Sequence, residues 1–284
     1  MKILIAGGAG LLGSELVRRL GGIHEVTATY HTQSPPAGVS TLRVDLSNIA
    51  EVQSLFGGQR FDVVINAAGA AAVDRCEQDH QHAEVGNIAI PRSLVQALAA
   101  SKTHLYHIST DYVFDGEAGP YDETAQARPI NYYGATKWHG EQVIAASGQP
   151  ATIVRVCSLY SLDLGVRSNL YNSVVAALAQ GQQYVAATDL WSNPTNVADV
   201  ADAFADLLAL GATPPVIHLA GREHLSRHAF ACRVARHAGY DSAHVLAATT
   251  AELKLKAVRP RRAGLISRQA AALLGHDLPA FPQV

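Results

Sequence analysis

Residues 2–20, KILIAGGAGLLGSELVRRL, join an apolar run to a helical pattern through a glycine-rich turn. We expect a strand over Lys2–Ala6 and a helix over Leu11–Leu20. Gly7, Gly10 and Gly13 are evenly spaced in the turn, where glycine allows a tight bend, close approach to a pyrophosphate and dense helix–strand packing. The free N–H groups at the start of the helix favour a bound phosphate. The stretch therefore predicts a dinucleotide-binding turn, and an ordinary tight turn is the alternative.

Strand-like and helical runs alternate after this turn. The expected strands are Glu25–Tyr30, Thr41–Val44, Phe61–Asn66, Leu105–Ser109 and Ala151–Cys157, and the expected helices are Ala83–Ala100 and Gly134–Ala146. Strands that alternate with helices favour a parallel sheet with helices on both faces. We therefore predict an α/β fold, a doubly wound parallel sheet of the Rossmann type, over residues 1–157.

Helical patterns dominate after about residue 158. The expected helices are Ser168–Gln180, Asn196–Leu210, Ser226–Ala238 and Ser267–Leu274, and Pro215–Leu219 is a short strand candidate. We predict a smaller C-terminal α+β lobe over residues 158–284 that mainly binds substrate. A strand or a helix of this lobe can return to the main sheet.

Composition excludes several classes of protein. Among 284 residues, 48% are hydrophobic and the formal net charge is −2, which argues against disorder and against nucleic-acid or membrane-surface binding. No apolar run approaches the roughly 20 residues that span a bilayer. The three cysteines are widely spaced, and Met1-Lys2 leads straight into a strand without a signal-peptide pattern. We expect a cytoplasmic protein with reduced thiols, a monomer or a homodimer.

The end of the second strand bears on the choice of dinucleotide. An acidic residue there would bind the ribose hydroxyls and repel a 2′-phosphate. Tyr30, His31 and Thr32 occupy these positions instead, which favours NADP(H), while the lack of a neighbouring arginine leaves NAD(H) possible. Asp45 is placed to contact the adenine edge, or it caps a helix that begins near Ser47. The other expected cofactor contacts are Leu11, Leu12, Leu46, Ala67, Ala68 and Gly69.

Tyr133 and Lys137 form a Tyr-x-x-x-Lys pair on an expected helix, where positions i and i+4 share a face. An ammonium beside a phenol lowers the phenol pKa, so that it can exchange a proton with a carbonyl oxygen. The lysine can also hold the nicotinamide ribose. Thr110 follows an apolar strand, at the sheet edge where ligands bind, and can donate a hydrogen bond to a substrate carbonyl. We predict that Thr110, Tyr133 and Lys137 are catalytic.

Two segments, ISTDYVFDG (residues 108–116) and YYGATKWHGE (residues 132–141), resemble the dTDP-4-dehydrorhamnose reductases of the extended short-chain dehydrogenase/reductase type. The likeness extends to Asn66-Ala67-Ala68, Arg155, Asn193-Pro194-Thr195 and Arg259-Pro260. It implies an NAD(P)-binding domain with a small substrate lobe, which reduces a 4-keto group of a nucleotide-linked deoxysugar, and the same catalytic trio. Tyr112 stands where related dehydratases carry an acid, and Ser109-Thr110 differs from the pair usual in epimerases.

Some expected pocket residues depart from the family pattern. Ala70-Ala71 replaces a Tyr-Thr pair, and Ser158 replaces a tryptophan. The substrate can therefore be another nucleotide-sugar or a related hydroxy-ketone. Two alternatives stay open. One is a non-catalytic NADP-binding regulatory subunit resembling the methionine adenosyltransferase β subunit, and the other is a sugar-nucleotide epimerase.

The remaining substrate candidates come from the C-terminal half. Trp191 can stack on a sugar or base, or it is a structural tryptophan under a loop. Arg259, Arg261 and Arg262 can bind a diphosphate, or they form a solvated patch. The expected substrate contacts are Asp111, Tyr112, Ser158, Trp191 and Arg259. His224 and His228 lack further ligands at suitable spacing, so we expect no metal site.

Overall fold

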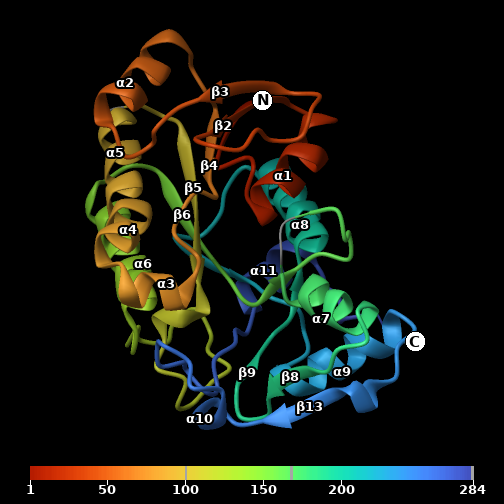
Figure 1. The fold of residues 1–284 in the computed structure, drawn as a ribbon. Helices are drawn as coiled ribbons and strands as arrows, with labels where there is room; N and C mark the ends of the chain where they lie inside the picture. The colour runs from red at the N-terminus through yellow and green to blue at the C-terminus, as the bar shows by residue number, and fades with distance from the viewer. Residues whose placement is uncertain (100, 167–168, 283–284) are drawn as a thin grey trace.

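The computed structural model describes residues 1–99, 101–166 and 169–282. Within them, a seven-stranded parallel sheet has the order β11-β6-β5-β4-β1-β2-β3 (Figure 1). Its strands are β1 (Lys2–Ala6), β2 (Glu25–Tyr30), β3 (Ser40–Arg43), β4 (Val63–Asn66), β5 (His104–Thr110), β6 (Ala151–Val156) and β11 (Val216–Leu219). The chain reverses its direction of travel across the sheet after β3. The predicted doubly wound α/β fold is therefore confirmed.

Helices cover both faces of this sheet (Figure 1). One face carries α1 (Leu11–Gly21), α8 (Val197–Leu210) and α11 (Arg268–Leu274), and the other carries α2 (Ile49–Gly58), α5 (Ile90–Ala97) and α6 (Tyr132–Ala146). Strand β1 shows why both faces need cover. Its Ile3 and Ile5 side chains join the first apolar core, whereas Leu4 and Ala6 join the second, because successive strand residues point to opposite faces.

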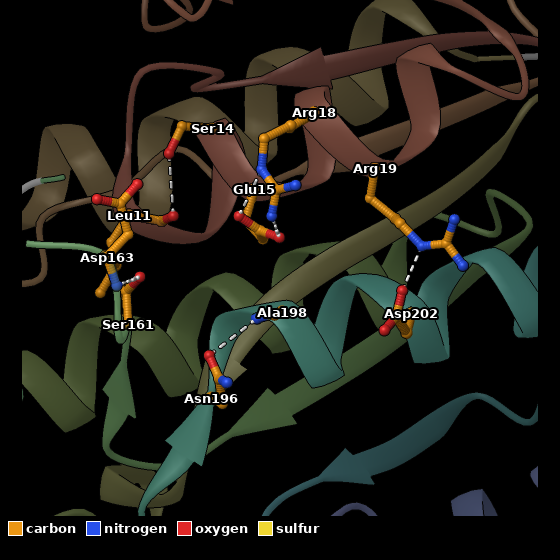
Figure 2. Close-up of polar contacts among 10 residues, drawn as sticks. All are labelled: Leu11, Ser14, Glu15, Arg18, Arg19, Ser161, Asp163, Asn196, Ala198 and Asp202. Atoms are coloured by element: carbon orange, nitrogen blue, oxygen red, sulfur yellow. Dashed lines mark hydrogen bonds and ion pairs between the residues drawn. The ribbon is translucent and has the colours of Figure 1, made fainter. Parts of the chain in front are cut away.

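Residues beyond 158 complete the main sheet. Strand β11 pairs in parallel with β6, and α8 packs along α1. Figure 2 shows this second contact, in which Arg19 of α1 forms an ion pair with Asp202 of α8. The α8 N-terminus is capped by the Asn196 side chain, which accepts a hydrogen bond from Ala198 N at 3.2 Å. A strand and helices of the C-terminal half thus build the layers of the dinucleotide-type fold.

The other C-terminal elements surround a separate aromatic core. They are β7 (Leu159–Tyr160), α7 (Leu170–Ala179), β8 (Tyr184–Ala187), β9 (Trp191–Ser192), β10 (Thr195–Asn196), β12 (Leu225–Ser226), α9 (Arg227–His237), β13 (Val245–Ala248) and α10 (Thr250–Leu253). Strand β8 pairs in parallel with β13, and Tyr160, Phe230 and Phe281 pack together beneath α7 and α9. The predicted helix over Ser168–Gln180 begins at Leu170, and Ser168 lies outside the described residues.

The helix predicted over Ala83–Ala100 is present up to Ala97, but it begins earlier and a π-helical turn interrupts it. After α3 (Val73–Gln78), the chain forms α4 (His80–Glu84), a π-helical turn over Val85–Ala89 and then α5. Pro91 gives a physical reason, because it has no N–H to donate to the carbonyl of Asn87 four residues earlier. Gly86 also lies so close to Ala70 that a Cβ atom would be 2.6 Å from Ala70 N. Ala100 lies outside the described residues.

A buried ion pair joins α6 to the sheet. Arg155 of β6 donates to both carboxylate oxygens of Glu141, at 3.0 and 2.7 Å, and the two side chains are 5% and 3% exposed. The hydroxyl of Ser109 on β5 donates to the same carboxylate. The Arg155 guanidinium lies 5.1 Å from the centre of the Phe114 ring. Each charge therefore has its partners in an environment that excludes water.

Removal of one partner should strongly destabilise the fold. We expect Glu141→Ala to lower the free energy of unfolding by about 3–5 kcal/mol, because Arg155 stays buried without its counter-charge. Urea denaturation measures this difference. Glu25→Ala is the control, because Glu25 pairs with Lys2 on the surface, with side chains 68% and 60% exposed. Equal effects of the two substitutions would contradict the structural role of the buried pair.

Candidate active site

The glycine turn after β1 forms a cradle that side chains would fill. Gly7 has φ of +80°, and its carbonyl accepts a hydrogen bond from Gly10 N at 2.9 Å. A Cβ atom on Gly13 would be 2.1 Å from Gly7 O, and one on Gly7 would be 2.8 Å from Ala68. Helix α1 follows with no side chain hydrogen-bonded at its cap. The residues present therefore fit a pyrophosphate at this helix N-terminus.

A cavity of about 480 Å³ opens beside this cradle, at the carboxyl ends of the central strands. Its lining includes Gly10, Leu11, Leu12, Ala67, Ala68 and Gly69. It also includes Ser158, Leu159, Asn169, Leu170 and Arg227. Thr110, Asp111, Tyr112, Tyr133 and Lys137 line the wall along with them. The structure thus brings most of the predicted cofactor, catalytic and substrate residues to one cavity.

Two adjacent elements hold the predicted catalytic residues. Thr110 ends β5, and Tyr133 lies in the first turn of α6, whose N-cap residue Asn131 accepts a hydrogen bond from Gly134 N at 2.8 Å. Gly134 lets α6 approach closely, because a Cβ atom there would be 2.1 Å from Tyr112 O. The Thr110 and Tyr133 side chains line the same cavity, and each carries a hydroxyl group. A carbonyl oxygen placed between them could accept a hydrogen bond from each.

The lowered phenol pKa predicted from the Tyr133–Lys137 spacing is wrong here. Burial raises the pKa of Tyr133 strongly, and the hydrogen bond with Thr110 opposes this only in part. Lys137 is directed elsewhere, since its Nζ donates to Ile108 O at 2.6 Å. None of the described contacts of Nζ reaches the Tyr133 hydroxyl. The phenol is therefore protonated at neutral pH, which suits a proton donor.

The environment of Lys137 also weakens its charge. Burial lowers the pKa of Lys137 to about 8, and the Glu141 carboxylate opposes this shift. The His107 Nε2 atom lies 3.5 Å from Nζ. Asn66 accepts from Ala68 N at 3.2 Å, so its amide NH₂ faces His107 Nδ1 at 2.9 Å and leaves the ring hydrogen on Nε2.

Asp111 shares a buried hydrogen bond with a thiol. The Cys157 thiol donates to Asp111 Oδ2 at 3.0 Å, and the two residues are 1% and 2% exposed. Burial raises the pKa of the Asp111 carboxyl, while its hydrogen bonds with Cys157 and Thr110 lower it. Asp111 therefore fixes the end of β5 where Thr110 lies.

Asn87 lines the cavity and has no counterpart among the residues predicted from sequence. It is 1% exposed, accepts from Ala70 N at 3.0 Å and donates to Thr136 Oγ1 at 3.0 Å. It thereby joins the loop after β4 to α6. The π-helical turn aims its side chain inward, and ordinary helical spacing gives no signal for such a turn.

Several predicted residues lie outside the main cavity. Tyr30, His31 and Thr32 stand at the end of β2, and Leu46 lies in the core beneath α2. Asp45 binds the Ser47 hydroxyl at 2.7 Å, and Asn48 rather than Asp45 caps α2. Trp191 and Arg259 line a second cavity of about 580 Å³, together with Arg261 and Arg262. Arg259 is also paired with Asp74 at 3.0 Å. Trp191 and Arg259 thus line a different cavity from the predicted catalytic residues.

An arginine does reach the end of β2, although none follows it in sequence. Arg43 of β3 pairs in register with Tyr30, and its Nε donates to His31 O at 3.1 Å. The side chain is otherwise exposed. This cation comes from the neighbouring strand β3 and not from the residues directly after β2, so the sequence that follows β2 does not reveal it.

No group of three or more histidine, cysteine, aspartate or glutamate side chains gathers within the described residues as metal ligands would. No helix within these residues is long and apolar enough to cross a membrane.

Known proteins resemble the chain over nearly its whole length. The family model described as RmlD substrate binding domain matches residues 1–283. A probable low-salt glycan biosynthesis reductase, Agl14, of Haloferax volcanii is 31% identical over 99% of this chain and 95% of its own. The dTDP-4-dehydrorhamnose reductase of Mycobacterium tuberculosis is 30% identical, with 94% and 86% covered.

A solved structure agrees with these sequence relatives. The crystal structure of Bacillus anthracis dTDP-4-dehydrorhamnose reductase in complex with NADP has a TM-score of 0.87 and 26% identity, with 98% of this chain and 95% of that chain covered. The family model and the relatives each cover most of the chain. The chain therefore belongs to the family described as the RmlD substrate binding domain.

Proposed function

We propose that the protein is an NAD(P)H-dependent ketoreductase that reduces a keto group of a nucleotide-linked deoxysugar, with NADP(H) preferred and NAD(H) possible. The observation that carries this proposal is that Thr110, Tyr133 and Lys137 line one cavity, which also reaches Gly10 of the glycine cradle. Relatives named as dTDP-4-dehydrorhamnose reductases support the same activity. The complete catalytic set favours a reductase over a regulatory subunit, and the protonated phenol favours ketone reduction over epimerisation.

In this proposal the chain's own residues bind and protonate the carbonyl oxygen. Thr110 and Tyr133 both donate hydrogen bonds to that oxygen and polarise the carbonyl group. The reduced dinucleotide, when bound, supplies a hydride. Tyr133 gives its phenolic proton to the oxygen, and Lys137 in its charged form stabilises the phenolate left behind. Lys137 also lies where it could hold the nicotinamide ribose.

The dinucleotide would be held at the sheet edge. The Gly7–Gly13 turn and the N-terminus of α1 would hold its pyrophosphate, and Ala67, Ala68 and Gly69 would face its nicotinamide half. Arg43, beside His31, would bind the 2′-phosphate of NADP. We also propose, from sequence, that residues 158–284 mainly serve the substrate, and that the protein works in the cytoplasm as a monomer or homodimer.

Replacement of the phenol tests the proposed function directly. We expect Tyr133→Phe to reduce kcat for NADPH-dependent reduction of a 4-keto nucleotide-sugar by about 10²–10⁴-fold, because the proton donor is lost. Calorimetry should show unchanged NADPH affinity. Tyr132→Phe is the matched control, since its hydroxyl binds Glu84 at 2.5 Å, away from the cavity. Substantial turnover by Tyr133→Phe would refute the assignment of the proton donor.

Arg43 offers a test of the cofactor preference. We expect Arg43→Ala to raise the KM for NADPH about tenfold while the KM for NADH stays unchanged, because NADH has no 2′-phosphate. Steady-state kinetics with each cofactor measure the difference. Arg18→Ala is the control, because Arg18 pairs with Glu15 on the exposed side of α1. Parallel changes for the two cofactors would show that Arg43 does not read the phosphate.

Lys137 should lower stability at neutral pH. The shift of its pKa from 10.5 to about 8 corresponds to about 3 kcal/mol. Below pH 8 the lysine is protonated in the folded and unfolded states, so the folded state carries the full penalty. Between pH 8 and 10.5 only the unfolded state remains protonated, and the penalty fades. We therefore expect Lys137→Met to stabilise the protein at pH 7, by about 1–3 kcal/mol, and to lose this gain by pH 10.5.

Urea denaturation at the two pH values measures this effect. The lost hydrogen bond to Ile108 O offsets part of the gain at both pH values. Lys102→Met, at an exposed lysine, is the control and should change stability little at either pH. A loss of stability at pH 7, or a gain that does not depend on pH, would contradict the buried-charge penalty.

A further inference from the structure

Arg227 is a cation of the main cavity that the catalytic scheme leaves unused. It is the first residue of α9, and its side chain lines the cavity that also holds Thr110, Tyr133 and Lys137. Its Nε atom is buried and has no hydrogen-bond partner among the described residues. A buried donor on a charged group that lacks an acceptor destabilises the folded protein. A bound ligand that supplies the acceptor would remove this cost.

The protein groups near Arg227 do not neutralise it. Its positive charge is close enough to lower the pKa of Asp111 and of Tyr112, although burial raises both more strongly. Asp111 already accepts from the Cys157 thiol, and no ion pair joins it to Arg227 in the described part of the chain. The contrast with Arg155 is informative, because that guanidinium has the Glu141 carboxylate as its counter-charge. Among the residues that the structure describes, Arg227 is thus a guanidinium of this cavity that is open to an anion.

The position of Arg227 indicates which anion this is. The glycine cradle, where the cofactor's pyrophosphate would lie, follows β1, whereas the charge of Arg227 acts on Asp111 and Tyr112 directly after β5. Strand β4 separates β1 from β5 in the sheet, and Thr110, which would hold the reacting carbonyl, ends β5. A group that enters beside Arg227 is thus the part of the substrate that does not react. In a nucleotide-linked sugar, that part begins with the diphosphate.

We propose that Arg227 binds the diphosphate of the substrate and so holds the sugar ring against Thr110 and Tyr133. This assignment rests on the proposed function for the nature of the substrate. A guanidinium can bind two phosphate oxygens at once, which fixes orientation as well as position. Binding energy from this remote group then places the carbonyl group for reaction.

Nucleotide probes test the assignment without turnover. For the wild-type protein, calorimetry should show much tighter binding of dTDP than of thymidine. We expect Arg227→Met to weaken dTDP binding at least tenfold, and to leave thymidine and NADPH affinity unchanged. Arg236→Met on the same helix is the matched control, because that side chain is exposed and bonded to Ser242. In the reductase assay, Arg227→Met should raise KM more than it lowers kcat.

Each alternative outcome has a separate meaning. The assignment is overturned if dTDP binds the wild type no better than thymidine, if Arg227→Met binds dTDP normally, or if it loses NADPH affinity instead. A different result would count against the proposed function alone. In that case the wild type shows no ketoreductase activity, while a correctly folded Arg227→Met variant still loses dTDP binding, so that the diphosphate site stands. Arg227→Gln, which keeps polarity without charge, repeats the measurement if the methionine variant fails to fold.

Discussion

The buried contact between α6 and the centre of the sheet is the constraint on which the site depends. Glu141 joins Arg155 of β6 and Ser109 of β5 one turn beyond Lys137, so the helix that carries the phenol and the lysine cannot slide along the strand that ends in Thr110. Catalytic groups need placement within a fraction of an ångström. The buried Glu141 carboxylate is bonded to residues of both β5 and β6, and these directional contacts fix the position of α6.

Burial shifts the pKa values of Tyr133 and Lys137 in opposite directions. It makes the phenolate of Tyr133 and the ammonium of Lys137 costly, so both groups favour their neutral forms more than free side chains do. Reduction of a ketone calls for a phenol that keeps its proton until the oxygen gains charge. Because burial brings the pKa of Lys137 to about 8, a negative charge that forms on a nearby oxygen would favour its protonated form. The enclosed cavity thus matches the direction of the proposed reaction.

Much of the fold could be predicted from sequence because its signals are local. The stretch of residues 2–20 contains a strand, a turn and a helix start, and Tyr133 and Lys137 need only helical spacing to share a face. Tertiary placement was harder to foresee. Arg43 reaches His31 through strand pairing, and Asn87 turns inward through a π-helical turn that Pro91 favours. Neither position carries a pattern that separates it from ordinary surface or helix residues.

Helices α8 and α11 have a consequence for how the chain acquires its structure. They come from the last third of the sequence, yet they cover the sheet face that includes Ile3, Ile5 and Ile65. During synthesis α1 alone can cover part of that face until α8 and α11 leave the ribosome, and an incompletely covered apolar sheet invites association with other chains. Because the N-terminal strands and the C-terminal helices share one core, we expect the two halves of the chain to fold together late in translation and not one after the other.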